Sequence, residues 1–181
     1  MSIKFKINSN KSLESVVYIT GLFPGATQYY ISKILYYAEK FHLNRYGFPI
    51  VGDTYKKMSH GPVPSFVLNL LKQNVIDKSM LNKVSKALNV QKEGNKLHIY
   101  PKRPANLYEF SGTELDCIDE AITLCKNKTF SELRDLSHKE PAWENAKDNG
   151  IMDYELMIDK RNVNRAVIIA DLKERTEFLG A

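Results

Sequence analysis

Long hydrophobic runs are absent from the chain, and none of its 181 residues belongs to an apolar stretch near the ~20 residues that span a membrane. The first twelve residues, MSIKFKINSNKS, have no apolar core after their lysines and are therefore unlike a secretory signal peptide. Hydrophobic residues still make up 43% of the chain and charged residues 26%, which argues against disorder. These features predict a globular cytoplasmic protein that makes no contact with a membrane.

Cysteine is scarce, because the chain has only Cys117 and Cys125. Both fall in one predicted helix, where eight residues span about 12 Å. That separation exceeds the ~7 Å limit between the Cα atoms of a disulfide. We therefore predict two free thiols that are buried, unreactive and in a reducing compartment.

Catalytic signatures are also missing. The sequence contains no glycine-rich nucleotide-binding loop, no HExxH zinc motif, no GxSxG nucleophile motif and no paired CxxC. Its histidines stand apart, with no second ligand at a spacing typical of zinc; they are His42, His60, His98 and His138. We therefore predict no catalytic activity, no metal and no cofactor.

One enzymatic alternative stays open. Asp53 with His60, or Glu140 with His138, could form acid–base pairs, and Asp53, His60 and His138 could share a pocket. The same pairs are more typical of structural hydrogen bonds that fix a loop.

Apolar residues at helical spacing dominate the chain. The strongest pattern predicts a tyrosine-rich helix from Ala26 to Tyr46, ended by Gly47, with more tyrosines than one face can bury. Some of these rings are therefore expected at the surface or against a partner. Ser12 is predicted to cap an earlier helix that ends at Gly21.

The middle of the chain mixes short elements. Residues 54–58 are expected to be extended, and residues 60–64 to form a rigid loop. Ser65 and Ser79 are predicted to cap two helices. Residues 90–100 are predicted to form a β-hairpin that turns at Gly94.

The second half is predicted to be helical. Capping boxes begin helices at Ser111 and Thr129, Pro141 suits the first turn of a short helix, and a last helix is expected over 163–178. Without repeats or long linkers, residues 1–181 are predicted to form one domain. The fold class is mainly α (α+β): a compact single-domain helical bundle with a small β-hairpin.

The formal net charge is +5 and the isoelectric point about 9.0. The basic residues look scattered and interleaved with acids, for example at 56–57, 102–103 and 160–161. A dedicated DNA-binding protein usually concentrates them on one face. A second hypothesis nevertheless stays open, a winged-helix transcriptional regulator in which the hairpin with Lys92, Lys96, Lys102 and Arg103 is the wing.

Two stretches carry a family resemblance. The first runs from Lys33 to Tyr55 and is followed by Met58-Ser-His-Gly-Pro-Val-Pro-Ser65; the second is Leu136-Ser-His-Lys-Glu-Pro-Ala-Trp143. Together they resemble the Panacea domain family, also called SocA-like antitoxins, over residues 27–147. Phe48 and Val51 depart mildly from the pattern, because family members often carry more polar residues there.

The resemblance implies a mostly helical antitoxin, common in phages and bacterial mobile elements, that neutralises a cognate toxin encoded nearby. Family members counter chemically unrelated toxins, so the toxin, the mode of neutralisation and the oligomeric state are left open. Antitoxins may also bind DNA at their own promoters. A phage-encoded interaction protein of another kind is a further alternative.

The predicted partner-binding residues lie within or beside these stretches: Tyr37, Asp53, Tyr55, Lys57, His60, Pro62, His138 and Trp143. Proline restricts φ, so a loop with Pro62 and Pro64 loses little entropy when a partner docks. A large rigid side chain such as Trp143 often dominates an interface. The alternative is that Trp143 anchors the core and that residues 60–62 are a tight connector.

Overall fold

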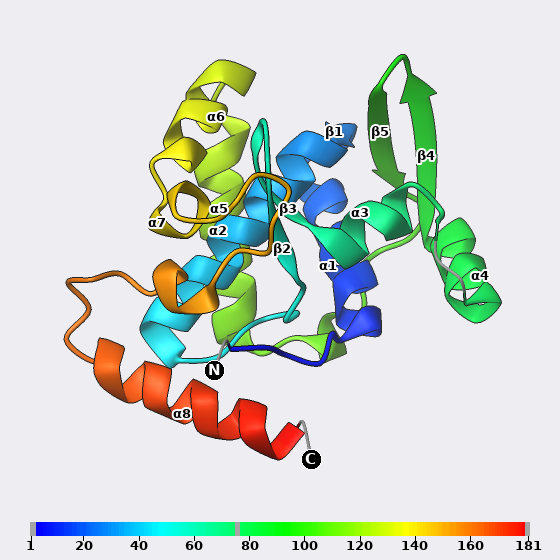
Figure 1. Cartoon of the computed structure of the whole chain (residues 1–181). Coiled ribbons are helices and arrows are strands. Elements are labelled where there is room, and N and C mark those ends of the chain that lie inside the picture. Colours follow the sequence, from blue (N-terminus) through cyan, green and yellow to red (C-terminus); the bar gives the residue numbers. More distant parts are fainter. Residues whose placement is uncertain (1–2, 75–76, 180–181) are drawn as a thin grey trace.

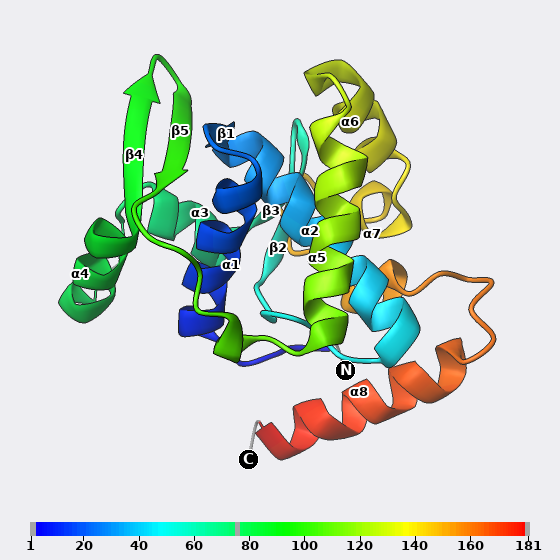
Figure 2. The same cartoon turned by 180° about the vertical axis from the view of Figure 1, so that it is seen from behind.

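The computed structural model describes residues 3–74 and 77–179. It is mainly helical with a small β part, as predicted, and α2 (Gln28–Tyr46) runs through its centre. Helices α1 (Ser9–Leu22) and α5 (Gly112–Lys126) pack against α2 (Figures 1 and 2). None of the helices in the described ranges is long and apolar enough to cross a membrane.

Helix α2 is enclosed over its middle. All nine residues from Ile31 to Glu39 are buried, so Tyr36 and Tyr37 lie inside the protein. The expected surface tyrosine is found at the helix end, where Tyr46 is 43% exposed. Gly47 ends the helix in the left-handed conformation, with φ of 74°, as its position predicted.

Two small antiparallel sheets flank this core. The first has the order β1-β5-β4, in which β4 (Leu88–Glu93) and β5 (Lys96–Pro101) form the predicted hairpin and β1 (Ala26–Thr27) pairs with β5. The second is a ribbon of β2 (Tyr55–Met58) and β3 (Gly61–Pro64). The prediction of a loop over 60–64 was therefore wrong, because a two-stranded ribbon tolerates proline at its outer edge.

The remaining helices are short, apart from the last. They are α3 (Ser65–Leu71), α4 (Lys78–Ala87), α6 (Phe130–His138), α7 (Pro141–Glu144) and α8 (Arg165–Leu179), with 3₁₀ turns at Leu107–Glu109 and Tyr154–Met157. Helix α8 lies across one end of the molecule, near the C-terminal end of α2 (Figure 1). Cys117 and Cys125 are free and buried, as predicted.

Helix starts follow the sequence where the signal is local. The capping boxes at Ser111 and Thr129 both form, and Pro141 occupies the first turn of α7. Ser12 does not cap α1; it lies one turn inside the helix, and the Asn8 side chain accepts from Lys11 N.

Two further predicted caps were wrong. Asp77, and not Ser79, caps α4 by accepting the Ser79 N–H. The free N–H groups in the first turn of α3 are bound by Asp53, whose two carboxylate oxygens accept from Phe66 N and Val67 N, each at 2.9 Å. A carboxylate 13 residues upstream therefore replaces the predicted cap, Ser65.

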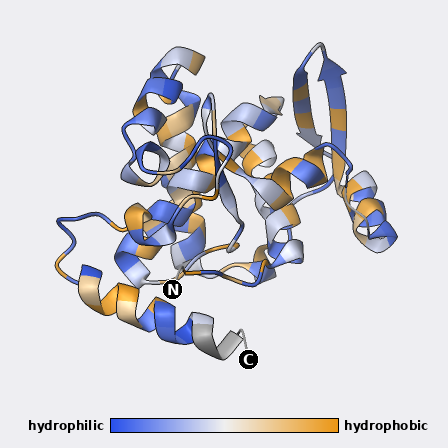
Figure 3. Cartoon of the chain, viewed as in Figure 1, coloured by the Kyte–Doolittle hydropathy of each residue, from blue (hydrophilic) through white to orange (hydrophobic). Residues whose placement is uncertain are grey.

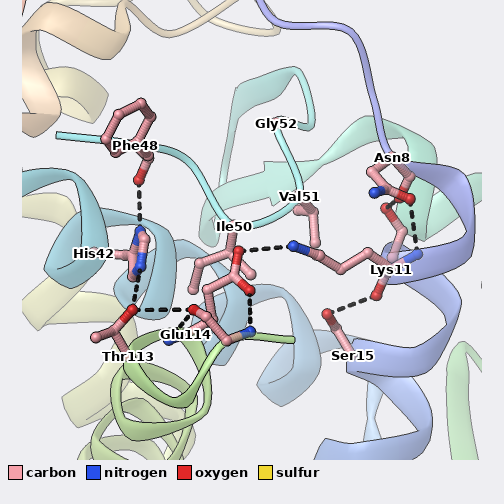
Figure 4. Close-up of polar contacts among 12 residues, drawn as sticks. Asn8, Lys11, Ser15, His42, Phe48, Ile50, Val51, Gly52, Thr113 and Glu114 are labelled. Carbon is pink, nitrogen blue, oxygen red and sulfur yellow. Dashed lines mark hydrogen bonds and ion pairs between the residues drawn. The ribbon is translucent and has the colours of Figure 1, made fainter. Parts of the chain in front are cut away.

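Polar contacts join the ends of three helices (Figure 4). His42 Nδ1 lies 2.8 Å from Phe48 O, and its Nε2 lies 3.2 Å from Thr113 Oγ1 at the start of α5. Lys11 Nζ pairs with Glu114 Oε1 at 2.8 Å, which connects α1 to the same turn. His42 is thus a structural, hydrogen-bonded histidine.

Candidate functional site

The two stretches that carry the family resemblance meet at the β2–β3 ribbon. Trp143 Nε1 donates to Met58 O at 3.1 Å, and the His138 ring stacks on the Trp143 indole. From α2, Lys33 Nζ donates to Pro62 O at 2.9 Å. Residues about 100 positions apart in the sequence therefore hold this ribbon in place.

Trp143 lies between an imidazole and an ammonium group. The His138 ring stacks on the indole with 3.8 Å between centroids, and Lys57 Nζ lies 4.4 Å from the indole centroid. Burial lowers the pKa of His138 below its usual 6.5, so the stacked ring is neutral at pH 7. Lys57 Nζ also donates to Ala146 O at 3.1 Å and lies 3.5 Å from Asp148 Oδ1.

Gly61 is the point of closest approach between the ribbon and the helices. Its φ is +103°, and a Cβ there would overlap Ser137 Oγ and lie within 3 Å of Lys33 Nζ. Glycine is therefore required both by the backbone conformation and by the space.

Lys33 is a fully buried lysine beneath the ribbon. Apart from its bond to Pro62 O, its ammonium lies 4.8 Å from the Tyr29 ring centroid. Burial lowers the pKa of Lys33 to about 7, so the side chain is poised between its two protonation states at neutral pH.

Glu39 positions the loop before β2. Its carboxylate accepts from Ile50 N at 2.7 Å, Val51 N at 3.2 Å and Gly52 N at 2.9 Å, and also from the Tyr154 hydroxyl at 3.2 Å. Burial nevertheless raises the pKa of Glu39 to about 7. Glu39 and Asp53 together fix the chain on both sides of Gly52.

The proposed acid–base pairs are not present. The Asp53 carboxylate is committed to the start of α3, and burial raises its pKa. Glu140 pairs with Lys40 Nζ at 2.8 Å and accepts from the Tyr36 hydroxyl at 3.3 Å. His138 and His60 contact aromatic rings instead.

The eight predicted partner-binding residues divide by burial. Tyr37, Asp53 and Tyr55 are at most 3% exposed, so these side chains offer a partner no surface. Pro62 is buried as well. The other four lie at the ribbon. Lys57, His138 and Trp143 are partly exposed, and His60 is exposed.

The exposed part of the ribbon forms an aromatic-rich surface with α6. His60 meets Phe130 edge-on at 5.2 Å between centroids, and Phe130 lies 4.4 Å from the Tyr29 ring. Phe130 is 41% exposed and Met58 36%. We call Met58, Ser59, His60 and Phe130, with the adjoining edge of Trp143, the tip surface.

Sequence reasoning missed Met58 and Phe130. Phe130 opens α6 and is 41% exposed, and sequence reasoning did not single it out. The position of Met58 could have been predicted to be exposed, because it ends a short strand immediately before the turn residues Ser59 and His60.

A pocket of about 300 Å³ adjoins the tip surface. It is lined by Lys57, Met58, Ser59, Trp143, Asp148 and Asn149. A side chain of a partner that rests on the tip could enter it, with a cation and an anion at its wall. Across residues 3–74 and 77–179, no three His, Cys, Asp or Glu side chains are grouped as metal ligands would be.

A family model described as "Antitoxin SocA-like, Panacea domain" matches residues 31–144, which is more than half of the chain. The matched range includes both stretches that meet at the ribbon. Neither the curated proteins nor the solved structures give a significant match.

Proposed function

The chain belongs to the family of SocA-like antitoxins with a Panacea domain, and from this premise we propose that it neutralises a toxin protein by binding it through the tip surface. The observation that carries the proposal is that the two stretches shared with the family contain both buried and exposed residues. Their buried residues hold the β2–β3 ribbon, while Met58, Ser59 and His60 stand exposed at its turn.

The composition of the tip surface suits a protein partner. Methionine and aromatic residues are enriched in protein interfaces, and exposed Met58 and Phe130 lie next to His60 and the Trp143 edge. The His138–Trp143 ring stack and the hydrogen bond from Trp143 to Met58 O keep this surface rigid, so docking would cost little conformational entropy.

We propose that neutralisation proceeds by binding alone, without a bond made or broken in the toxin. In support, the buried ionisable side chains behind the ribbon and around the loop before it have structural roles. Asp53 caps a helix, Glu39 holds a loop, and Lys33 supports Pro62.

Co-expression with the product of the neighbouring gene tests the proposal. That product should arrest growth when expressed alone, and the present protein should restore growth and co-elute with it on a sizing column. Restored growth without a stable complex, or no protection at all, would contradict direct binding.

A further inference from the structure

The excess positive charge of the chain is concentrated in one segment. Residues 72–103 contain eight basic residues and two acids, a net charge of +6, whereas the whole chain carries +5. The rest of the protein therefore has a net charge of −1. The expectation of scattered basic residues was wrong.

The segment folds into adjacent elements on one side of the molecule, α4 followed directly by β4 and β5 (Figures 1 and 2). Helix α4 contains no acidic residue. Its inner face buries Met80, Val84 and Ala87, and its exposed face carries lysines and small polar residues: Lys78, Ser79, Asn82, Lys83, Ser85 and Lys86.

The β4–β5 hairpin extends this charge away from the body. Lys92 and Lys96 are both exposed beside the turn, and Figure 3 shows hydrophilic residues at the hairpin tip. The acid beside them, Glu93, has Oε2 3.3 Å from His98 Nε2. We call the exposed lysines of α4 and the hairpin, Lys78, Lys83, Lys86, Lys92 and Lys96, the basic strip.

The charges of the basic strip are uncompensated. None of its lysines forms an ion pair within the described part of the chain, and Lys83 Nζ contacts a neutral amide, Asn10 Oδ1, at 2.9 Å. Arg103, by contrast, is held by the buried Glu14 carboxylate and lies outside the strip. Neighbouring like charges repel one another unless a polyanion neutralises them.

We propose that the basic strip binds duplex DNA through its phosphate backbone. The ten residues of α4 and the six of β4 span up to about 35 Å, close to one turn of B-DNA. Serine and asparagine hydroxyl and amide groups beside the lysines are further donors to phosphate oxygens.

Other polyanionic or acidic partners fit this surface less well. Single strands are bound by stacking on exposed aromatic rings, and no large hydrophobic side chain of the described residues between 72 and 103 is exposed. The same lack disfavours a membrane, which needs apolar insertion, and a protein interface, which needs an apolar centre.

The strand order gives independent support. Strand β1 follows α1, and the β4–β5 hairpin directly follows α4. Strand β1 pairs with β5, which gives the order β1-β5-β4. This is the strand order of a winged-helix module, in which the helix and the hairpin wing both contact DNA.

Fluorescence anisotropy with a labelled 24-base-pair duplex tests the proposal on the full-length protein. Four or five phosphate contacts predict an affinity that falls about 150- to 500-fold between 50 and 200 mM salt. The triple variant Lys86→Gln, Lys92→Gln, Lys96→Gln should bind at least 10-fold more weakly at 50 mM salt, with a shallower salt dependence. These side chains are exposed, so the melting temperature should stay unchanged.

The matched control is Lys147→Gln, Lys160→Gln, Arg161→Gln, which removes three exposed charges elsewhere. This control should bind the duplex within about two-fold of the unchanged protein. An equal loss in both variants would mean that net charge alone acts, and would overturn the proposal. Equal or tighter binding to a single strand, to polyglutamate or to phosphatidylserine vesicles would overturn the assignment to duplex DNA.

Discussion

The imidazole of His138 lies flat on the indole of Trp143, with 3.8 Å between the ring centroids and 9° between the planes. The two residues stand on α6 and α7, and Trp143 also donates a hydrogen bond to Met58 O at the ribbon turn. This stack therefore fixes the turn of β2 and β3 to both helices at once.

Replacement of Trp143 with alanine should lower the free energy of unfolding by about 3 kcal/mol, because the ring loses its stack and its hydrogen bond to Met58 O. Trp143→Phe keeps an aromatic surface and should cost about 1 kcal/mol, the value of the lost N–H donor. Urea denaturation of the two variants measures both. Equal losses would show that the indole N–H, and not the stack, holds the turn.

Replacement of Gly61 with alanine should destabilise the fold by about 3 kcal/mol or more. Alanine at this position would have to adopt a positive φ, which side chains with a Cβ disfavour. Its Cβ would also displace the Lys33 or Ser137 side chain. Gly94→Ala is the matched control, because Gly94 also has a positive φ but nothing lies within 4 Å of its Cβ position. The control should lose about 1 kcal/mol. Thermal denaturation that ranks the two variants equally would contradict the close contact at Gly61.

Stability should pass through a minimum near pH 7. Between pH 4.5 and about 7, folded Glu39 holds a proton that the unfolded chain has released, so stability falls as pH rises. Between about 7 and 9, unfolded Lys33 holds a proton that the folded chain lacks, so stability rises with pH. Above pH 9 the buried Cys125 thiol opposes this rise, because burial raises its pKa in the folded chain to about 12. Melting temperatures measured from pH 5 to 9 should follow this curve.

Single variants separate the two arms of that curve. Glu39→Gln should remove the fall in stability below pH 7, and Lys33→Met should remove the rise above pH 7. Lys160→Met, at an exposed position, should change neither part of the curve. A rise in stability through pH 7 that survives Lys33→Met would show that another group titrates there.

Replacement of His60 with alanine should weaken toxin neutralisation at least 10-fold and leave the fold intact. The side chain is exposed, so the change in unfolding free energy should stay within about 0.5 kcal/mol. Asp116→Ala, at an exposed position on α5, should protect as well as the unchanged protein. Full protection by His60→Ala, together with a lowered melting temperature, would identify His60 as a structural residue.

The sequence predicted what is local. Capping boxes, the Gly47 helix end, the hairpin at Gly94 and the start of α7 at Pro141 each depend on residues within one turn of one another. Strand β3 was missed because its two prolines resemble a rigid loop, and its pairing with β2 outweighs that local preference.

Long-range polar contacts were beyond the sequence. Asp53 caps a helix 13 residues away, and Lys33 and Glu39 are charged residues inside a buried run of α2. Their main hydrogen-bond partners are backbone atoms, and the pattern of side chains in a sequence does not predict such partners. For the same reason, half of the predicted partner-binding residues proved to be buried in the framework behind the tip surface.

The ribbon edge is also joined to the chain that follows α7. Asn149 N donates to Lys57 O, Lys57 N to Gly150 O, and Met152 N to Tyr55 O, each at 2.9 Å. Strand β2 therefore lies between β3, which follows it directly in the sequence, and residues 149–152. A protein that clamps the turn would slow amide hydrogen exchange at residues 149–152 as well as at the turn itself, and mass spectrometry of the deuterated complex could record that pattern without any mutation.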